Sequence, residues 1–275
     1  MKKLLIIACA FTLMFGACKK NDSSDTGSGG STTLTVQKVN KAMLFDFSET
    51  WCPPCGAYGG PSFDSCLVGM EISKISLMKV YGSSTPSTFN AAISNAMGNS
   101  FNVSGVPTFF VNEQELASGG GVYSNIGANY NWVKQKAEAF AAGTVNAGVA
   151  LSKSISGTTM TVKTKVKFYV AQPATKNLKL AVYVVEDHLI ASQSVSGSGT
   201  VTNYEHRNLL RDCNAADYTG VDLNAGVAVT VDQEFSKDFT FTLNSTWKTA
   251  NLKVIAVIWD ATSGKAKLIN SNMVK

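Results

Sequence analysis

The hydrophobic pattern of this 275-residue chain changes its period near Gly143, and the change limits the folds that the chain can adopt. Before Gly143, short apolar runs alternate with segments in which apolar residues recur every three or four positions. After it, apolar and polar residues alternate one by one. The first pattern is typical of strands that alternate with helices, and the second of antiparallel strands with one buried face. We therefore expect an α/β domain over 34–143, followed by an all-β antiparallel sandwich domain over 144–275.

Within 34–143 the expected strands are short and mostly apolar, as buried strands are. They are 41–47, 74–81, 109–111 and, after a turn at 112–115, the return strand 116–117. A helix is expected after each of the first two strands, and the second of these helices follows Ser87. Its apolar residues recur at steps of four: Phe89, Ile93 and Met97. A third helix is expected over 126–140, with Ser124 placed to cap its start.

Within 144–275 the alternation of apolar and polar residues predicts strands with one buried and one polar face. The clearest of these are 160–170, 178–184, 239–243 and 252–258. Turn residues separate them, and no long linker precedes them. The two expected domains should therefore join tightly.

The N-terminus predicts export and a lipid anchor. Residues 1–17 combine a basic head with an apolar core that is shorter than the about 20 residues of a membrane-spanning helix. Small residues before Cys18 resemble a bacterial lipobox, whose cysteine carries lipid; an ordinary signal peptide with an incidental cysteine is the alternative. Residues 18–33 are polar and rich in glycine and serine, which indicates a flexible tether. We expect Cys18 to anchor the protein in the lipid bilayer of the outer membrane, facing either the periplasm or the outside.

The charge balance gives no reason to expect a nucleic-acid partner. The chain has 24 basic and 19 acidic residues, and removal of residues 1–17 takes away Lys2 and Lys3. The remaining 22 basic and 19 acidic residues give a net charge of +3, which is close to neutral. Nucleic-acid-binding domains typically carry a strong basic excess.

Cys52 and Cys55 form a Cys-Pro-Pro-Cys motif preceded by Trp51. At the first turn of a helix, unpaired backbone N–H groups would favour the thiolate of Cys52. Cys55, one turn further on, could then attack a mixed disulfide at Cys52. Pro53 and Pro54 suit a first helical turn and stiffen the loop. The motif therefore favours thiol–disulfide exchange over a purely structural bridge, which would close a very small loop.

The other candidate ligands and thiols are scattered along the sequence. A zinc site usually takes four ligands, commonly from two such cysteine pairs, so no metal is expected. The scattered residues are Cys66, Cys213, His188 and His206. Cys66 is interpreted either as a small buried residue or as one end of a structural disulfide to Cys213. Neither histidine has an acid or nucleophile at motif spacing, so both are expected to be structural.

The segment from Phe45 to Cys55 resembles the active-site segment of thioredoxin-like proteins: an apolar strand, an acid, a tryptophan and Cys-x-x-Cys. The acid is Asp46, six residues before Cys52. The resemblance implies a thioredoxin-like fold for 34–143. It also implies that Asp46 is buried with a raised pKa and helps to deprotonate Cys55.

A second likeness lies in Gly105–Phe110, which resembles the cis-proline turn of the same proteins. It implies a cis bond before Pro107, with that proline packed against the two sulfurs. It also implies that the backbone of Val106 pairs with an extended substrate peptide. The substrate-binding residues implied by the two segments together are Trp51, Pro53, Pro54, Val106 and Pro107. No organic cofactor is implied, because the Cys52–Cys55 disulfide would itself carry the electrons.

The C-terminal half has a likeness of its own. The segment Asn203–Arg211, in a β-rich half behind such a domain, resembles the lipoproteins related to outer membrane protein 28. Asn208 stands where that family often has a second histidine. The resemblance implies an outer-membrane lipoprotein and leaves the role of the sandwich open.

Together these features predict a lipid-anchored thiol–disulfide oxidoreductase that acts on protein thiols and disulfides of the cell envelope. The alternative is a surface lipoprotein with a binding or assembly role, in which the thioredoxin-like domain is only a scaffold. The direction of electron flow is open, because it depends on the reduction potential and on the available partner.

Overall fold

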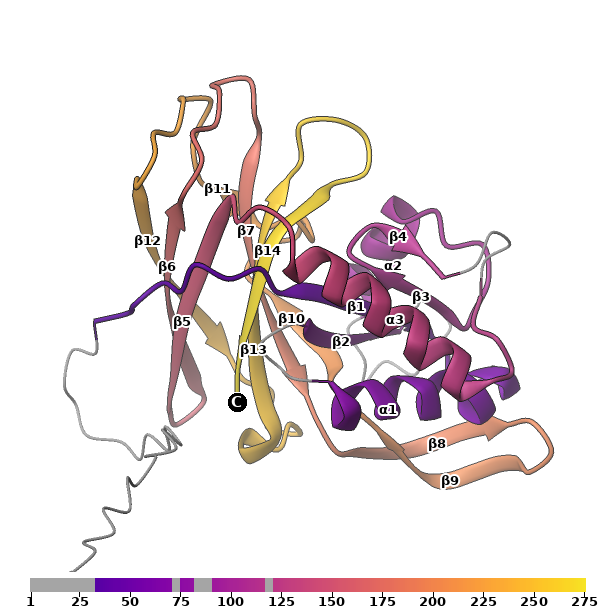
Figure 1. Cartoon of the computed structure of the whole chain (residues 1–275). Helices are drawn as coiled ribbons and strands as arrows, with labels where there is room; N and C mark the ends of the chain where they lie inside the picture. The colour runs from indigo at the N-terminus through magenta and orange to yellow at the C-terminus, as the bar shows by residue number, and fades with distance from the viewer. Residues whose placement is uncertain (1–32, 71–74, 82–90, 117–120) are drawn as a thin grey trace, which may run out of the picture. The chain divides into compact units, whose positions relative to one another are not determined.

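The computed structural model describes residues 33–70, 75–81, 91–116 and 121–275 (Figure 1). In the first part of the chain the strands are β1 (Ala42–Ser48), β2 (Ile75–Tyr81), β3 (Thr108–Val111) and β4 (Gln114–Glu115). The helices are the π-helical turn η1 (Cys55–Gly59), α1 (Gly60–Gly69), α2 (Ala91–Ser100) and α3 (Ile126–Ala141). Strand β1 pairs in parallel with β2 and antiparallel with β3. Among the described residues, no helix is long and apolar enough to cross a membrane.

Strand β1 is buried along its whole length because helices cover both faces of the sheet at this point. Alternate side chains of a strand point to opposite faces. Met43, Phe45 and Phe47 pack with Ile93 and Met97 of α2. On the other face, Ala42 and Leu44 pack with residues of α1 and α3, which lie side by side in Figure 1. By the same alternation, Asp46 is the next residue of β1 after Leu44 to point to this second face.

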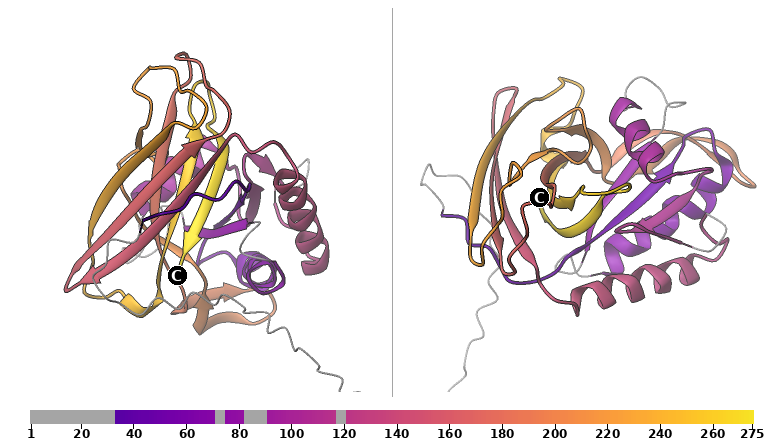
Figure 2. Two further views of the ribbon diagram at one scale, coloured as in Figure 1. Left: turned by 60° about the vertical axis from the view of Figure 1, so that its left-hand side comes forward. Right: turned by 90° about the horizontal axis from the view of Figure 1, so that it is seen from above.

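The rest of the chain is almost entirely β-structure. Its strands are β5 (Ala147–Ser156), β6 (Thr159–Phe168), β7 (Leu178–Glu186), β8 (Leu189–Val195), β9 (Gly199–His206), β10 (Leu209–Cys213), β11 (Val221–Asp222), β12 (Glu234–Thr242), β13 (Leu252–Asp260) and β14 (Lys267–Val274). A short 3-10 turn, η2 (Thr249–Asn251), precedes β13. Strands β12, β6 and β5 form a three-stranded antiparallel sheet. It faces β7 and β13 across an apolar core, as the views of Figure 2 show.

One large sheet contains strands from both parts of the chain. Its order is β14-β13-β7-β10-β2-β1-β3-β4, with β11 paired to β7. The parts meet where β10 pairs in parallel with β2, at Leu209 and Lys79. The backbone N–H of Lys79 also donates to the carbonyl oxygen of Asn208 at 2.7 Å. One face of this sheet carries a shared core in which Phe45 of β1 stacks on Trp259 of β13.

Strands β7 and β13 differ from the expected pattern of one buried and one polar face. Every residue of β7 except Lys179 is buried, and β13 is buried from Val254 to Trp259. The reason is their position, since the three-stranded sheet covers one face and the shared core covers the other. The β-rich, antiparallel character expected for 144–275 is confirmed.

Most expected elements of the first part are present, with local differences. The return strand lies at Gln114–Glu115 instead of 116–117, because the turn is shorter and Asn112 takes a left-handed conformation (φ 58°). The cap of α3 is Asn125 and not Ser124, since the Asn125 side chain accepts a hydrogen bond from the N–H of Ala128. Ser87 and Phe89, expected at the start of α2, lie outside the described residues.

Strands β7 to β10 form a bent two-stranded ribbon. Its inner half is the pair β7–β10 within the large sheet, and its outer half is the pair β8–β9. The bend lies at His188 and Asn208, which both adopt a left-handed conformation, with φ of 54° and 47°. Beyond this bend the ribbon leaves the sheet and passes α1 (Figure 1).

The bend is held by an ion cluster around Asp187. Its Oδ1 accepts a hydrogen bond from Nε of Arg207 at 2.6 Å, and its Oδ2 accepts one from Nζ of Lys253, also at 2.6 Å. Burial acts to raise the pKa of Asp187, but the hydrogen bonds from Arg207 and Lys253 outweigh it and hold the pKa well below its usual range. The cluster therefore stays charged, and it fixes the direction of the outer ribbon.

Candidate functional site

A disulfide joins Cys52 and Cys55 at the carboxyl end of β1. Their Cα atoms are 5.3 Å apart, and the two residues are 2% and 1% exposed. Pro53 and Pro54 between them are exposed and begin the helical path that continues through η1 into α1. Prolines fit here because the first N–H groups of a helix lack intrahelical partners.

The backbone N–H of Cys55 has two acceptors in the turn that carries the disulfide. It lies 3.1 Å from the carbonyl oxygen of Cys52 and 3.2 Å from Sγ of the same residue. An N–H group directed at a sulfur atom stabilises negative charge there. This turn can therefore stabilise a thiolate at Cys52 when the disulfide is reduced.

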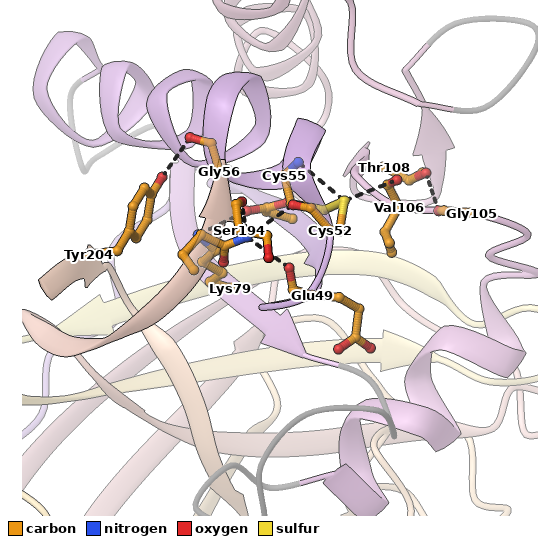
Figure 3. The surroundings of a disulfide bond; sticks show 12 residues. Glu49, Cys52, Cys55, Gly56, Lys79, Gly105, Val106, Thr108, Ser194 and Tyr204 are labelled. Carbon is orange, nitrogen blue, oxygen red and sulfur yellow. Dashed lines mark hydrogen bonds and ion pairs between the residues drawn. A yellow bond between two sulfur atoms is a disulfide. The ribbon is translucent and has the colours of Figure 1, made fainter. Parts of the chain in front are cut away.

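The bond between Val106 and Pro107 is cis, as the sequence predicts. The carbonyl oxygen of Val106 lies 3.5 Å from Sγ of Cys52 (Figure 3). The hydroxyl of Thr108 donates to the carbonyl oxygen of Gly105 at 2.7 Å and so closes the turn. The disulfide and the proline turn thus meet in space, although Cys52 and Val106 are 54 residues apart in sequence.

A groove of about 490 Å³ opens beside these two turns. Its lining includes Trp51, Phe47, Val80, Gly105 and Val106. The side chain of Trp51 is 55% exposed. The groove therefore combines an exposed aromatic ring with the backbone next to the cis bond, which suits contact with an extended chain.

Asp46 and Lys79 form a buried pair on neighbouring strands, since they are register partners of β1 and β2. Nζ of Lys79 lies 3.7 Å from Oδ2 of Asp46, and the two side chains are 2% and 0% exposed. Burial raises the pKa of Asp46 to about 6, and the positive charge of Lys79 partly opposes this. Among the described residues, neither carboxylate oxygen of Asp46 has a hydrogen-bond partner. The carboxyl group can therefore gain and lose a proton near neutral pH.

The outer ribbon β8–β9 contacts the disulfide loop through its backbone. The N–H of Ser194 donates to the carbonyl oxygen of Thr50 at 2.8 Å, and the N–H of Ser196 donates to that of Pro53 at 3.0 Å. The two acceptors, Thr50 and Pro53, lie on either side of Cys52 in the sequence. The loop is thus held by β1 at one end and by the ribbon along its side.

Strand β9 adds aromatic and imidazole groups above the buried pair. The hydroxyl of Tyr204 donates to the carbonyl oxygen of Gly56 at 3.2 Å (Figure 3). Nζ of Lys79 lies 5.9 Å from the ring centre of Tyr204 and 5.5 Å from that of Tyr81. His206 is hydrogen-bonded to the hydroxyl of Tyr81, and burial lowers its pKa to about 3, with the charge of Lys79 acting in the same direction. The imidazole is therefore neutral.

The disulfide between Cys66 and Cys213 that the sequence left open is not present, because both are free thiols. Cys66 lies in α1 and packs with Phe63, Phe109 and Val133 on the helix-covered face. Cys213 ends β10 and packs at the edge of the core on the other face of the sheet. Burial raises the pKa of each thiol to about 12, so both stay protonated.

The remaining scattered residues do not gather into a metal site. Across the described ranges, no group of three or more His, Cys, Asp or Glu side chains could hold a metal ion. His188 contacts the carboxylates of Glu205 and Asp187 at the bend of the ribbon. Asn208 lies at the same bend, where its Oδ1 accepts a hydrogen bond from Lys253 at 2.8 Å.

Lys79, Tyr204 and Gln193 belong to the site but are not among the residues predicted from sequence. Lys79 did carry a signal, because it is the one charged residue in the mostly apolar run 75–81. Tyr204 lies in the segment Asn203–Arg211, which carries the resemblance to lipoproteins related to outer membrane protein 28, but nothing in that segment pointed to the disulfide, and Gln193 carried no signal. They reach the disulfide loop only because the ribbon bends toward it.

Comparison with known proteins addresses the identity of the chain. A family model described as outer membrane protein Omp28 matches residues 94–275, which is more than half of the chain. The chain belongs to the Omp28 family. This confirms the expected location in the outer membrane of the cell envelope. The region matched to Omp28 includes Pro107 but begins after Cys52 and Cys55, so family membership alone says nothing of the disulfide.

Solved structures add a likeness in fold. HBP35 of Porphyromonas gingivalis is 20% identical, with a TM-score of 0.63, over 86% of this chain and 75% of that chain. A domain of the outer membrane lipoprotein Omp28 from the same organism is 14% identical, with a TM-score of 0.31, over 48% of this chain and 88% of that one. No curated protein matches the chain. The likeness to HBP35 is therefore one of fold.

Proposed function

We propose that this Omp28-family protein is a thiol–disulfide oxidoreductase, anchored by lipid at Cys18, that acts on proteins of the cell envelope. The observation that carries the proposal is the contact between the Cys52–Cys55 disulfide and the cis-proline turn, in which the carbonyl oxygen of Val106 lies 3.5 Å from Sγ of Cys52. The buried Asp46 of β1, the strand that leads into the disulfide loop, supports it. The order β1-α1-β2-α2-β3-β4-α3 supports the likeness of this part to thioredoxin-like proteins. No further cofactor is needed, because the two cysteines carry both electrons.

In the reducing direction, the thiolate of Cys52 attacks one sulfur of a partner disulfide. A mixed disulfide forms and the first partner thiolate leaves. Cys55 then loses its proton to Asp46 and attacks Sγ of Cys52. This step restores the Cys52–Cys55 disulfide and releases the second partner thiolate, so that two electrons pass to the partner. In the oxidising direction the same steps run backwards, and the reduction potential selects between them.

The remaining residues have supporting roles in this proposal. Trp51 and Val106 line the groove along which the partner chain approaches, Val106 offers its backbone to that chain, and the buried Pro107 holds the turn that presents Val106. Pro53 and Pro54 narrow the range of conformations open to the disulfide turn.

The proposal is tested with a protein that comprises residues 31–275. The measurement is the rate at which it reduces the disulfide of a model protein, with dithiothreitol as the electron source. The unmodified protein should accelerate the reaction, and Cys52→Ser should lower the rate to that of dithiothreitol alone. Cys213→Ser is the matched control, because Cys213 is a protonated thiol away from the loop. Activity that survives Cys52→Ser would refute the role assigned to Cys52.

A binding or assembly role at the outer membrane is the second candidate. It is favoured by the family match, which starts at residue 94 and leaves out both cysteines of the disulfide. In that case the first part of the chain would serve as a scaffold. An ordinary thiol pKa at Cys52 and a lack of exchange with glutathione would support this candidate over the first.

A further inference from the structure

The outer ribbon β8–β9 brings a buried amide side chain against the disulfide loop. Gln193 of β8 is 1% exposed. Its Nε2 donates to the carbonyl oxygens of Glu49 and Cys52, each at 3.0 Å, and lies 2.9 Å from that of Ser194. Carbonyl oxygens are acceptors, so the atom of the amide that faces these three must be the donor nitrogen Nε2 and not Oε1. This fixes the orientation of the amide.

The contacts with Glu49 and Cys52 bridge 144 and 141 residues of sequence and are buried. Among the described residues, Oε1 of Gln193 has no hydrogen-bond partner. A buried acceptor without a partner costs about 1–3 kcal/mol. An apolar residue would avoid this cost, so the two donated bonds are the reason that an amide suits this position.

The contact with Cys52 bears on the chemistry of its sulfur. The carbonyl oxygen of Cys52 and its Sγ both lie within reach of the N–H of Cys55, at 3.1 and 3.2 Å. When Gln193 donates to this oxygen, the oxygen competes less for the N–H of Cys55. More of that N–H is then available to a thiolate at Sγ, where a charge-assisted hydrogen bond is the stronger one.

We propose that Gln193 is a positioning residue of the redox site, through which the C-terminal half of the chain stabilises the thiolate of Cys52. This inference rests on the proposed function and adds the ribbon to the working parts of the site. The β-rich half of this chain is then a regulator of the disulfide, because anything that lifts the ribbon removes the donor.

Gln193→Met in the full chain, purified in detergent, tests this inference. Methionine keeps the size and burial of the side chain but has no N–H donor. The first readout is the rate of Cys52 alkylation by iodoacetamide in the reduced protein between pH 5 and 9, followed by peptide mass. The second is the equilibrium of Cys52–Cys55 with reduced and oxidised glutathione. Thr202→Ala, at an exposed position of β9, is the matched control.

The expected result for Gln193→Met is a fall in alkylation rate at pH 6 of about three- to tenfold, as a partial loss of one hydrogen bond to a charged group implies. The glutathione equilibrium should move toward the disulfide by a similar factor. Thr202→Ala should change neither. Gln193→Asn, whose side chain is too short to reach both carbonyls, should shift both readouts the same way and provides a second variant if the first does not fold.

Two contrary results separate the inference from the proposed function. If the unmodified protein equilibrates with glutathione and the folded Gln193 variants match it in both readouts, the positioning role is wrong and the redox function stands. If the unmodified protein does not equilibrate with glutathione at all, the redox function fails, and the positioning role fails with it.

Discussion

Asp46 is a buried carboxyl whose protonation state is set by its surroundings. Its side chain has no exposed surface, and its charge is paired with that of Lys79, whose Nζ lies 3.7 Å from Oδ2 of Asp46. Burial in a poorly solvated place disfavours the charged form, which is why the pKa rises to about 6. Near neutral pH the group is therefore poised between its two protonation states.

The first prediction concerns the stability that this residue contributes. The pKa of Asp46 is raised on folding, so its contribution is fully present below the unfolded pKa and is lost as pH rises through about 6. Asp46→Asn, which stays neutral, should not show this loss. Urea unfolding of both proteins between pH 3 and 8 measures the difference, and a constant difference across this range would contradict the assignment.

The second prediction concerns the resolving step of the proposed reaction. Asp46 can accept the proton of Cys55 only when it is ionised, so the step should accelerate as pH rises through about 6. Asp46→Asn should slow the step at pH 7 by about 10²-fold, the lower range for general base catalysis. Stopped-flow measurement of mixed-disulfide decay in single turnovers tests this. An Asn variant with an unchanged rate at pH 7 would show that Cys55 loses its proton elsewhere.

At the scale of elements, the contact between the ribbon and the disulfide loop requires a glycine. A Cβ atom at Gly56 would lie 2.4 Å from the carbonyl oxygen of Ser194 and 2.7 Å from Cγ2 of Val195. The first of these neighbours is backbone, so relief requires the ribbon itself to move.

Gly56→Ala should therefore destabilise the protein by about 1–3 kcal/mol and loosen the ribbon. Gly98→Ala in α2 is the matched control, because its Cβ would meet only Phe47 at 3.9 Å, and alanine is favoured in a helix. Hydrogen exchange of the Ser194 and Ser196 amides measures the loosening. Exchange as slow in Gly56→Ala as in the control would mean that the contact is not tight in solution.

The elements that sequence could predict are those whose side chains pack against an apolar core. Strands β6, β7 and β13 lie against apolar cores, and their alternating or apolar runs were found at nearly the observed positions. Strands β8 and β9 were missed because they are mostly exposed or half-buried and show no clean alternation. The cysteine pair, the acid and the proline turn were readable since each has a short motif. Gln193 was not, because its partners are set by the bend of the ribbon.

At the scale of the whole molecule, the large sheet unites the two parts that the sequence separates by period. Strand β2 receives β10 along one edge, and the ring of Trp259 lies 6.2 Å from that of Phe45. Both contacts join residues on either side of Gly143. The part that carries the disulfide is thus completed by the part that carries the β-rich core.

A shortened chain of residues 34–143 should therefore not fold as a stable monomer. It would expose the edge of β2 and the apolar face that packs on β13, and bare strand edges promote association. Size-exclusion chromatography and circular dichroism of this fragment, beside residues 34–275, measure the outcome. A folded, monomeric fragment with a native thermal transition would show that the shared sheet is dispensable.

The backbone contacts between the ribbon and the disulfide loop have a consequence for the comparison of relatives. Ser194 and Ser196 donate their backbone N–H groups to the backbone carbonyl oxygens of Thr50 and Pro53. Every amino acid except proline has this N–H donor, and all have the carbonyl acceptor. Substitutions at these positions can accumulate in descendants without a compensating change on the other side. Correlated substitutions in a sequence alignment would therefore fail to reveal this interface. Whether relatives keep it can be established only by comparing their backbone structures.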